Sequence, residues 1–385
     1  MSRFRAWRRF AIPVTVLAAL AAVGLGWRAN REEAPAPRSH DAAVVNETGR
    51  APNRFVRDGK IRGTNLVAGR RMGEEGFEAL LRSNVEWISV TPFGWQERLD
   101  GTEIRFGGEH GYWSERDSGI VELAAMAKGR GMRLAIRPHL WITGGGHGGG
   151  MNLADLDPGT AEGWRAWFAS YRAFALHYAA LAERTGADLY CVGAELRRAT
   201  AGHEAEWRSL IADVRAVYRG PVTYAANWYE EAEAIAFWDA LDYIGVQAYY
   251  PLAETALPDR DALARGWAKP VSVLERLHAR WKCPVIFTEV GWKSTEDGAV
   301  RPWEWPESRS QLLARISTRA QADAYEAFFR EVWPKPWFAG AYFWKWYGRH
   351  GRAGGPDDTD FTPQNKPAEA VMARGFAGAD SAGER

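Results

Sequence analysis

The sequence predicts one α/β domain with the architecture of a (β/α)8 barrel. Short apolar or β-branched segments alternate with longer segments of helical pattern, and eight such pairs follow residue 53. Several apolar segments, such as 285–288, show no polar alternation, which is typical of strands buried on both faces of a parallel sheet. Eight strand–helix units are the number that closes a barrel. An open doubly wound sheet is the alternative, but no glycine-rich phosphate turn follows the first expected strand.

The expected elements alternate regularly along the chain. The expected strands are 61–66, 85–91, 133–137, 188–193, 222–226, 243–247, 285–288 and 339–343. The expected helices are 76–82, 120–128, 161–184, 204–218, 232–241, 261–280, 317–332 and 367–374. In a barrel of this kind the site lies where the strands end, so the residues at these ends decide the function.

The composition narrows the class of ligand. Apolar residues make up 46% of the chain and charged residues 25%, as in ordinary globular proteins. Lys+Arg 49 against Asp+Glu 48 leaves no basic excess, so we expect no nucleic-acid partner. The 20 tryptophans are unusual. They either fill a large aromatic interior or, at strand ends and in loops, present flat apolar faces with a polar edge, on which sugar rings can stack.

The N-terminal region predicts export. Residues 1–31 combine a positive start, with four arginines, and a 17-residue apolar run from Ala11 to Trp27. They are expected to be a signal peptide or an uncleaved signal anchor. Either alternative places the body in the periplasm or outside the cell, and the anchor would tether it to the inner membrane. Residues 32–52 are expected to be a flexible linker, 53–376 the catalytic barrel and 377–385 a disordered tail.

Two of the expected strands end in a glutamate. Glu195 follows the fourth strand and Glu289 follows the seventh. These strands lie roughly opposite each other in an eight-stranded barrel, so both side chains can reach one ligand. A pair of carboxyl groups in one cleft is the arrangement that cleaves glycosidic bonds. Each glutamate taken alone would equally fit a structural ion pair.

The other strand ends are also rich in polar and aromatic residues. These ends are 91–96, 137–141, 227–229, 247–250, 289–292 and 344–347. The glycine-rich segment 144–150 is expected to form a mobile loop over the same face. Its His147 has no companion ligands, and no Cys/His spacing predicts a metal site or another cofactor.

Six of these segments resemble glycoside hydrolase family 113, a family of clan A. They are TPFGWQ, RPHLW, VGAEL, IGVQAYYPL, FTEVGW and YFWKWY, in a consistent order within roughly residues 55–350. The resemblance implies a retaining hydrolase of β-linked hexosides, with β-1,4-mannan as the substrate of its best-known members. It therefore implies an oligosaccharide or polysaccharide partner and no cofactor.

The resemblance also assigns roles to individual residues. Glu195 matches the general acid/base, Glu289 the nucleophile and Tyr249 the tyrosine that hydrogen-bonds the nucleophile. Trp344 or Trp346 matches the tryptophan beneath the sugar that precedes the cleaved bond. The other residues expected to bind substrate, from their places at strand ends, are His139, Asn227, Trp228, Trp292 and Trp95.

One position departs from the clan pattern. Many clan A enzymes have Asn directly before the acid/base, where it binds the sugar 2-hydroxyl, and this chain has Ala194. Another group such as Asn227 would then supply the contact, or the sugar differs. The alternatives to a mannanase are therefore a hydrolase of another bacterial β-glycan or exopolysaccharide, and a carbohydrate-binding barrel without catalysis. The sequence gives no indication of the oligomeric state.

Overall fold

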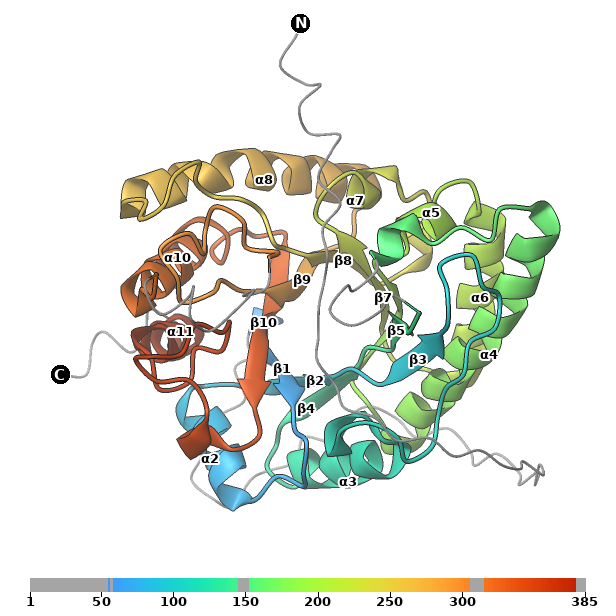
Figure 1. Cartoon of the computed structure of the whole chain (residues 1–385), viewed down its shortest axis with the longest axis horizontal. Coiled ribbons are helices and arrows are strands. Elements are labelled where there is room, and N and C mark those ends of the chain that lie inside the picture. Colours follow the sequence, from blue (N-terminus) through green and yellow to red (C-terminus); the bar gives the residue numbers. More distant parts are fainter. Residues whose placement is uncertain (1–54, 56–57, 145–151, 305–314, 379–385) are drawn as a thin grey trace, which may run out of the picture.

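In the computed structural model, which describes residues 55, 58–144, 152–304 and 315–378, eight parallel strands close into a barrel (Figure 1). The order around the barrel is β1-β10-β9-β8-β7-β6-β4-β2. The strands are β1 (Ile61–Val67), β2 (Trp87–Val90), β4 (Arg133–Ile136), β6 (Leu189–Ala194), β7 (Val222–Asn227), β8 (Tyr243–Gln247), β9 (Val285–Val290) and β10 (Phe338–Tyr347). All eight strands expected from the sequence are present, so the prediction of a (β/α)8 barrel is confirmed.

Helices surround the barrel, as Figure 1 shows. The main ones are α2 (Glu74–Arg82), α3 (Asp117–Lys128), α4 (Ala161–Thr185), α6 (Glu204–Val217), α8 (Arg260–Trp281), α10 (Thr318–Glu331) and α11 (Pro367–Ala377). The helix expected at 232–241 is replaced by two short pieces, α7 (Glu231–Ala234) and the 3-10 turn η4 (Trp238–Ala240). Glu231, the first residue of α7, is fully buried, and no apolar periodicity predicts this.

The apolar side chains form separate cores inside and outside the barrel. Strand residues from six strands meet inside it, namely Ile61, Trp87, Ala135, Leu189, Ile286 and Tyr342. A larger cluster packs the outward faces of the strands against the helices. Because both faces of each strand are covered, the strands are buried along almost their whole length, and the polar side chains that they carry, such as Thr64 and Asn65 on β1, are buried too.

A second, two-stranded parallel sheet extends from the barrel rim. It pairs β3 (Phe93–Gln96) with β5 (His139–Ile142), and it lies on the side of α3 and α4 in Figure 1. Both segments were predicted only as the ends of barrel strands. Their side chains alternate, so one face is buried and the other presents aromatic rings. The half-buried rings are Phe93, Trp95, His139 and Trp141.

Several predictions from the sequence fall outside the described residues. These are the export segment 1–31, the linker 32–52, most of the glycine-rich loop 144–150 and nearly all of the tail 377–385. Among the helices that the structure describes, none has the length and apolar character needed to cross a membrane.

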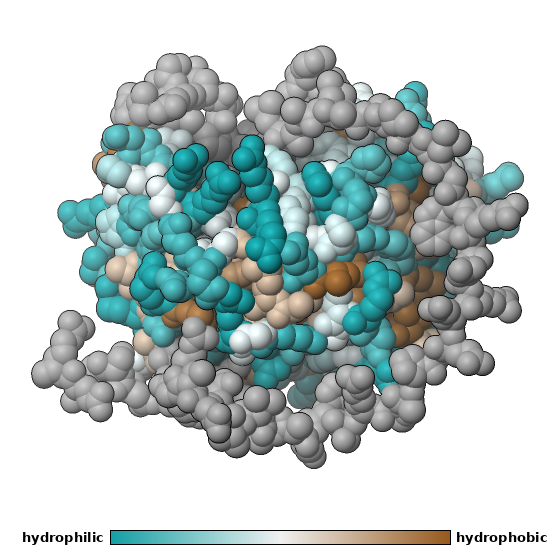
Figure 2. All heavy atoms as spheres, turned by 90° about the horizontal axis from the view of Figure 1, so that it is seen from below, coloured by the Kyte–Doolittle hydropathy of each residue, from teal (hydrophilic) through white to brown (hydrophobic). Residues whose placement is uncertain are grey.

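The surface seen in Figure 2 is mostly hydrophilic, with small apolar groups between the polar side chains. In the described part of the chain, the large apolar side chains classed as exposed are Tyr112, Val121 and Leu257. They belong to separate segments of the chain.

Candidate active site

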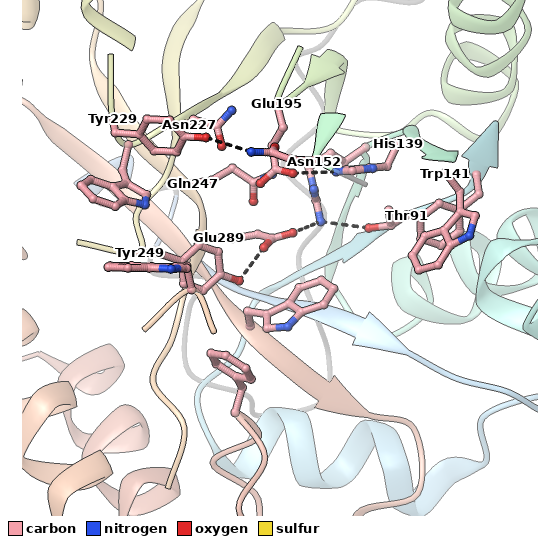
Figure 3. Close-up of a pocket in the computed structure, with 16 residues that line it drawn as sticks. Thr91, His139, Trp141, Asn152, Glu195, Asn227, Tyr229, Gln247, Tyr249 and Glu289 are labelled. Atoms are coloured by element: carbon pink, nitrogen blue, oxygen red, sulfur yellow. Dashed lines mark hydrogen bonds and ion pairs between the residues drawn. The ribbon is translucent and has the colours of Figure 1, made fainter. Parts of the chain in front are cut away.

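A cleft opens at the carboxyl ends of the barrel strands (Figure 3). Sixteen residues line it: Thr91, Phe93, Arg137, His139, Trp141, Asn152, Glu195, Asn227, Trp228, Tyr229, Gln247, Tyr249, Glu289, Trp303, Trp344 and Phe361. Most of them lie at or just after the carboxyl ends of barrel strands or belong to the small β3–β5 sheet. Both glutamates singled out from the sequence are among them, so the fold brings the expected carboxylate pair into one cleft.

Glu289 lies near the end of β9 and is held through both carboxylate oxygens. Arg137 Nη2 donates to Oε1 at 2.5 Å, and Tyr249 Oη donates to Oε2 at 2.5 Å. Burial raises the pKa of Glu289, and the nearby charge of Glu195 adds to this. The positive charge of Arg137 and the hydrogen bond from Tyr249 act in the opposite direction and favour the ionised carboxylate.

Arg137 is itself fixed by several contacts. Its side chain is almost wholly buried, and Nη2 also contacts Thr91 Oγ1 at 3.1 Å and Asn65 Oδ1 at 3.4 Å. Asn65 in turn donates to the carbonyl oxygens of Thr288 and Tyr342, which belong to neighbouring strands. A buried guanidinium needs a negative partner, and Glu289 is the carboxylate that supplies it.

Glu195 lies at the end of β6 in a more open setting. Its backbone has a φ of 59°, in the left-handed region, and its N–H donates to the carbonyl of Ala225 at 2.9 Å. His139 Nε2 is 3.5 Å from Glu195 Oε2. The other ring nitrogen of His139 lies 2.8 Å from the carbonyl oxygen of Leu140. That carbonyl can only accept, so it favours a proton on Nδ1, and Nε2 faces the carboxyl group of Glu195.

Two amides lie in register beside Glu289. Asn227 on β7 pairs with Gln247 on β8, and Gln247 pairs with Glu289 on β9. The buried carboxylate of Glu231 accepts hydrogen bonds from both the backbone and the side-chain nitrogen of Asn227, at 2.9 and 2.8 Å. Glu231 was not predicted as a site residue.

Aromatic rings form the walls of the cleft. Trp228 and Trp303 lie with ring centroids 5.5 Å apart on one side, and Trp141 with Phe93 extends from the small sheet on the other. Trp344 and Phe361 also line the cleft, and Trp344 is half-buried. Such rings offer apolar faces to a sugar while leaving their edges for polar contacts.

Only some of the predicted substrate-binding residues line the cleft. His139, Asn227, Trp228 and Trp344 line the cleft. Trp95 lies beside Trp141 on the same sheet face, with centroids 6.5 Å apart, and is not among the lining residues.

Two predicted tryptophans lie in the core instead. Trp292 is 1% exposed and packs against Trp267 and Tyr325, which belong to helices α8 and α10. Trp346 is fully buried, with His350 beside its ring. Like Trp344, both tryptophans lie near the carboxyl end of a strand, but their side chains are buried in the protein. The sequence does not specify the direction of these side chains.

Several lining residues were not predicted individually as site residues. Thr91 and Arg137 directly follow strands and Gln247 ends one, so their position at strand ends was a signal that pointed to them. Asn152, Trp303 and Phe361 come from loops, which no periodicity places. Within the described ranges, no group of three His, Cys, Asp or Glu side chains has the geometry to hold a metal ion.

Comparisons with known proteins agree with this geometry. The sequence pattern of glycoside hydrolase family 113 matches residues 69–366. A solved family 113 β-1,4-mannanase in a complex is 27% identical, with a TM-score of 0.69, covering 83% of this chain and 99% of that chain. No match was found among curated proteins.

A second solved structure, the family 113 β-mannanase of Alicyclobacillus acidocaldarius in complex with ManMIm, is 30% identical with a TM-score of 0.69. The match covers 83% of this chain and 97% of that chain. A β-glucuronidase from Ruminococcus gnavus, 14% identical with a TM-score of 0.53, covers 82% of this chain and 50% of that chain and shares the fold alone. The chain belongs to glycoside hydrolase family 113 and is a glycoside hydrolase.

Proposed function

We propose that this hydrolase cleaves β-1,4-mannan or manno-oligosaccharides by double displacement, with Glu289 as nucleophile and Glu195 as general acid/base. The observation that carries the proposal is the difference between the two carboxylates. Glu289 is buried and held on both oxygens, whereas Glu195 is more open and faces a histidine. Two carboxyl groups in different environments are what retaining hydrolysis requires. The solved mannanases that the chain is similar to support mannan as the substrate.

In the first step Glu289 attacks the anomeric carbon while Glu195 gives its proton to the glycosidic oxygen. The bond to the leaving sugar breaks, and a glycosyl ester with Glu289 forms. In the second step Glu195 takes a proton from water, and the water oxygen displaces Glu289 and restores the free carboxylate. Arg137 and Tyr249 hold the attacking carboxylate in one orientation throughout. Burial and the adjacent carboxylate raise the pKa of Tyr249, so its hydroxyl keeps its proton and remains a donor.

The aromatic walls suggest how the substrate lies. Trp344 lines the cleft from β10, the strand beside β9 that carries Glu289, and we assign its ring to the sugar on the glycone side of the cleaved bond. Trp228 and His139 contact sugars nearer to Glu195. We further propose that the enzyme acts outside the cytoplasm, because residues 1–31 combine a positive start with an apolar run of signal or anchor length.

The test is product release by the purified full-length protein from β-1,4-mannan, mannopentaose, a panel of other β-glycans and aryl β-glycosides. Wild type is expected to cleave the mannans. The activity of Glu195→Gln and of Glu289→Gln should each fall by about 10²–10⁴-fold. The anomeric form of the first product, followed by NMR, should be β. An α product would overturn the retaining mechanism, and full activity of either variant would overturn its role.

A second candidate substrate is another β-glycan, because Ala194 replaces the clan asparagine beside the acid/base. Cleavage of a different glycan in the panel, with mannan untouched, would replace the substrate and keep the mechanism. The two outcomes are distinguished in the same assay.

A further inference from the structure

We propose that Glu231 is a positioning residue of this active site, which orients the Asn227 amide so that its carbonyl oxygen accepts a hydrogen bond from a substrate hydroxyl. The proposal deepens the proposed function and rests on it. It concerns a residue that does not line the cleft and that the sequence did not point to. Its evidence is a set of hydrogen bonds around one fully buried carboxylate.

One oxygen of Glu231 determines the direction of the amide. Oε2 accepts from the backbone N–H of Asn227 at 2.9 Å and from its Nδ2 at 2.8 Å. With the nitrogen turned toward Glu231, the amide oxygen is the atom that remains for a ligand. Asn227 lines the cleft beside Glu195 and Gln247 (Figure 3), and its Oδ1 makes no hydrogen bond to other residues described in the structure.

The other oxygen of Glu231 connects this amide to the backbone next to Glu195. Tyr224 Oη donates to Oε1 at 2.6 Å, and Thr200 Oγ1 donates at 3.2 Å. The same Tyr224 hydroxyl accepts from the N–H of Leu196 at 2.8 Å. Leu196 directly follows Glu195, whose left-handed φ of 59° is uncommon for a residue with a side chain. Glu231 thus braces the ends of two neighbouring strands through one network.

In this arrangement Asn227 can supply the polar contact that Ala194, at the position of the clan asparagine, cannot make. Ala194 has no polar side chain, and its register partner on β7 is Ala225, two residues before Asn227. Asn227 therefore presents an amide on the adjacent strand, two residues nearer to the barrel mouth than the register partner of Ala194. A fixed, largely buried acceptor rejects ligands that offer no hydroxyl to it, because the acceptor is then left unpaired. The expected ligand group is a hydroxyl of the hexose bound at the cleavage site.

The first experiment compares Glu231→Leu and Glu231→Gln by kcat and KM on mannopentaose. Leu removes all four accepted hydrogen bonds, and kcat/KM should fall by about 10- to 100-fold, the size of one or two lost hydrogen bonds to a buried group. Gln keeps a carbonyl oxygen for Asn227, so it should stay within about threefold of wild type. Glu233→Gln, at an exposed position on the same short helix, is the matched control and should leave both constants unchanged.

The second experiment asks whether Glu231 acts through Asn227. In an Asn227→Ala background, adding Glu231→Leu should change kcat/KM by less than about twofold, because the amide to be oriented is already absent. Equal losses in both backgrounds would overturn the proposal, since a merely structural effect is additive. Melting temperatures are recorded for every variant.

A milder substitution covers the case in which Glu231→Leu does not fold. Asn227→Asp keeps the shape of the side chain but puts a second carboxylate against Glu231, so kcat/KM should fall about as far as in Asn227→Ala. Wild-type activity of Asn227→Asp would overturn the proposal. If wild type spares mannopentaose, the proposed substrate has failed, and the same variants are compared on the glycan of the panel that wild type does cleave.

Discussion

Arg137 and Glu289 form a buried ion pair across the barrel, with Arg137 Nη2 2.5 Å from Glu289 Oε1. The two residues are 152 positions apart in the chain, and their side chains are 3% and 9% exposed. Burial by itself disfavours the charged carboxylate and raises the pKa of Glu289, and Arg137 is the largest of the opposing influences. The role proposed for Glu289 requires an ionised carboxylate, so this pair would link the packing of the barrel to the pH range of the reaction.

Replacing Arg137 by Met should move the acidic limb of the pH profile upward. Without the guanidinium, the pKa of Glu289 rises further, so the carboxylate becomes protonated at a higher pH and kcat/KM falls there. The measurement is kcat/KM as a function of pH, on the glycan that the wild-type enzyme cleaves. Arg137→Lys keeps the charge and is the control, with its limb expected closer to that of wild type. A limb of Arg137→Met that coincides with wild type would contradict the assignment.

Tyr249→Phe should have a smaller effect of the same sign. The variant loses the 2.5 Å hydrogen bond to Glu289 Oε2 and keeps the ring, so the pKa of Glu289 rises and kcat falls by about 10- to 100-fold. Tyr250→Phe is the matched control. It removes the same hydroxyl group from the next residue, whose ring packs against Trp228 and Trp267. Equal kinetics for the two variants would speak against a catalytic contribution of the contact between Tyr249 and Glu289.

Azide should separate the roles of the two glutamates. In Glu289→Ala, azide can attack an activated aryl β-glycoside from the open face and give an α-glycosyl azide. In Glu195→Ala the glycosyl ester still forms, and azide, which needs no general base, should release it as a β-glycosyl azide. NMR of the products distinguishes the two anomers. The reverse pattern would exchange the two assignments.

The barrel could be predicted because its signals are local. Buried parallel strands appear in the sequence as short, mostly apolar segments. Segments with helical periodicity alternate regularly with them along the chain. The position of Glu195 and Glu289 at the barrel mouth could be predicted for the same reason, since a charged residue at the carboxyl end of such a strand lies there; their catalytic roles stay predictions.

The remaining site residues depend on side-chain direction and on loops. Trp344 and Trp346 are two residues apart on β10, yet Trp344 lines the cleft and Trp346 is buried. Glu231 is buried because the fold brings Tyr224 and Thr200 against its carboxylate, and this tertiary contact cannot be seen in the sequence. Surface glutamates at helix starts have the same sequence appearance, so no pattern would have separated it from them.

Substitutions at two tryptophans should show this difference in direction. Trp344→Ala removes a ring from the cleft, so kcat/KM should fall by at least about tenfold with a modest loss of stability. Trp292→Ala removes a buried ring packed against Trp267 and Tyr325 and should lower the free energy of unfolding by about 3–5 kcal/mol. Urea unfolding and kinetics on both variants test this. A large kinetic defect in folded Trp292→Ala would show that this ring also supports the site.

The buried carboxylate of Glu231 should make the stability of the protein depend on pH. Burial is the main cause that raises the pKa of Glu231 from 4.5 to about 7, and the charge of Glu195 adds to it. Between these values the folded protein holds a proton that the unfolded chain has released, so stability falls as the pH rises. This contribution is fully present below about pH 4.5 and is lost as the pH passes 7.

Glu231→Gln removes this titration, because the amide carries no charge at any of these pH values. The difference in free energy of unfolding, variant minus wild type, should therefore grow in favour of the variant between pH 4.5 and 7.5. Taking the difference cancels the slopes from other groups, including the raised pKa of Glu289. Urea unfolding at three pH values, with Glu233→Gln as control, measures it. A difference that stays constant with pH would mean that Glu231 has an ordinary pKa in the folded protein.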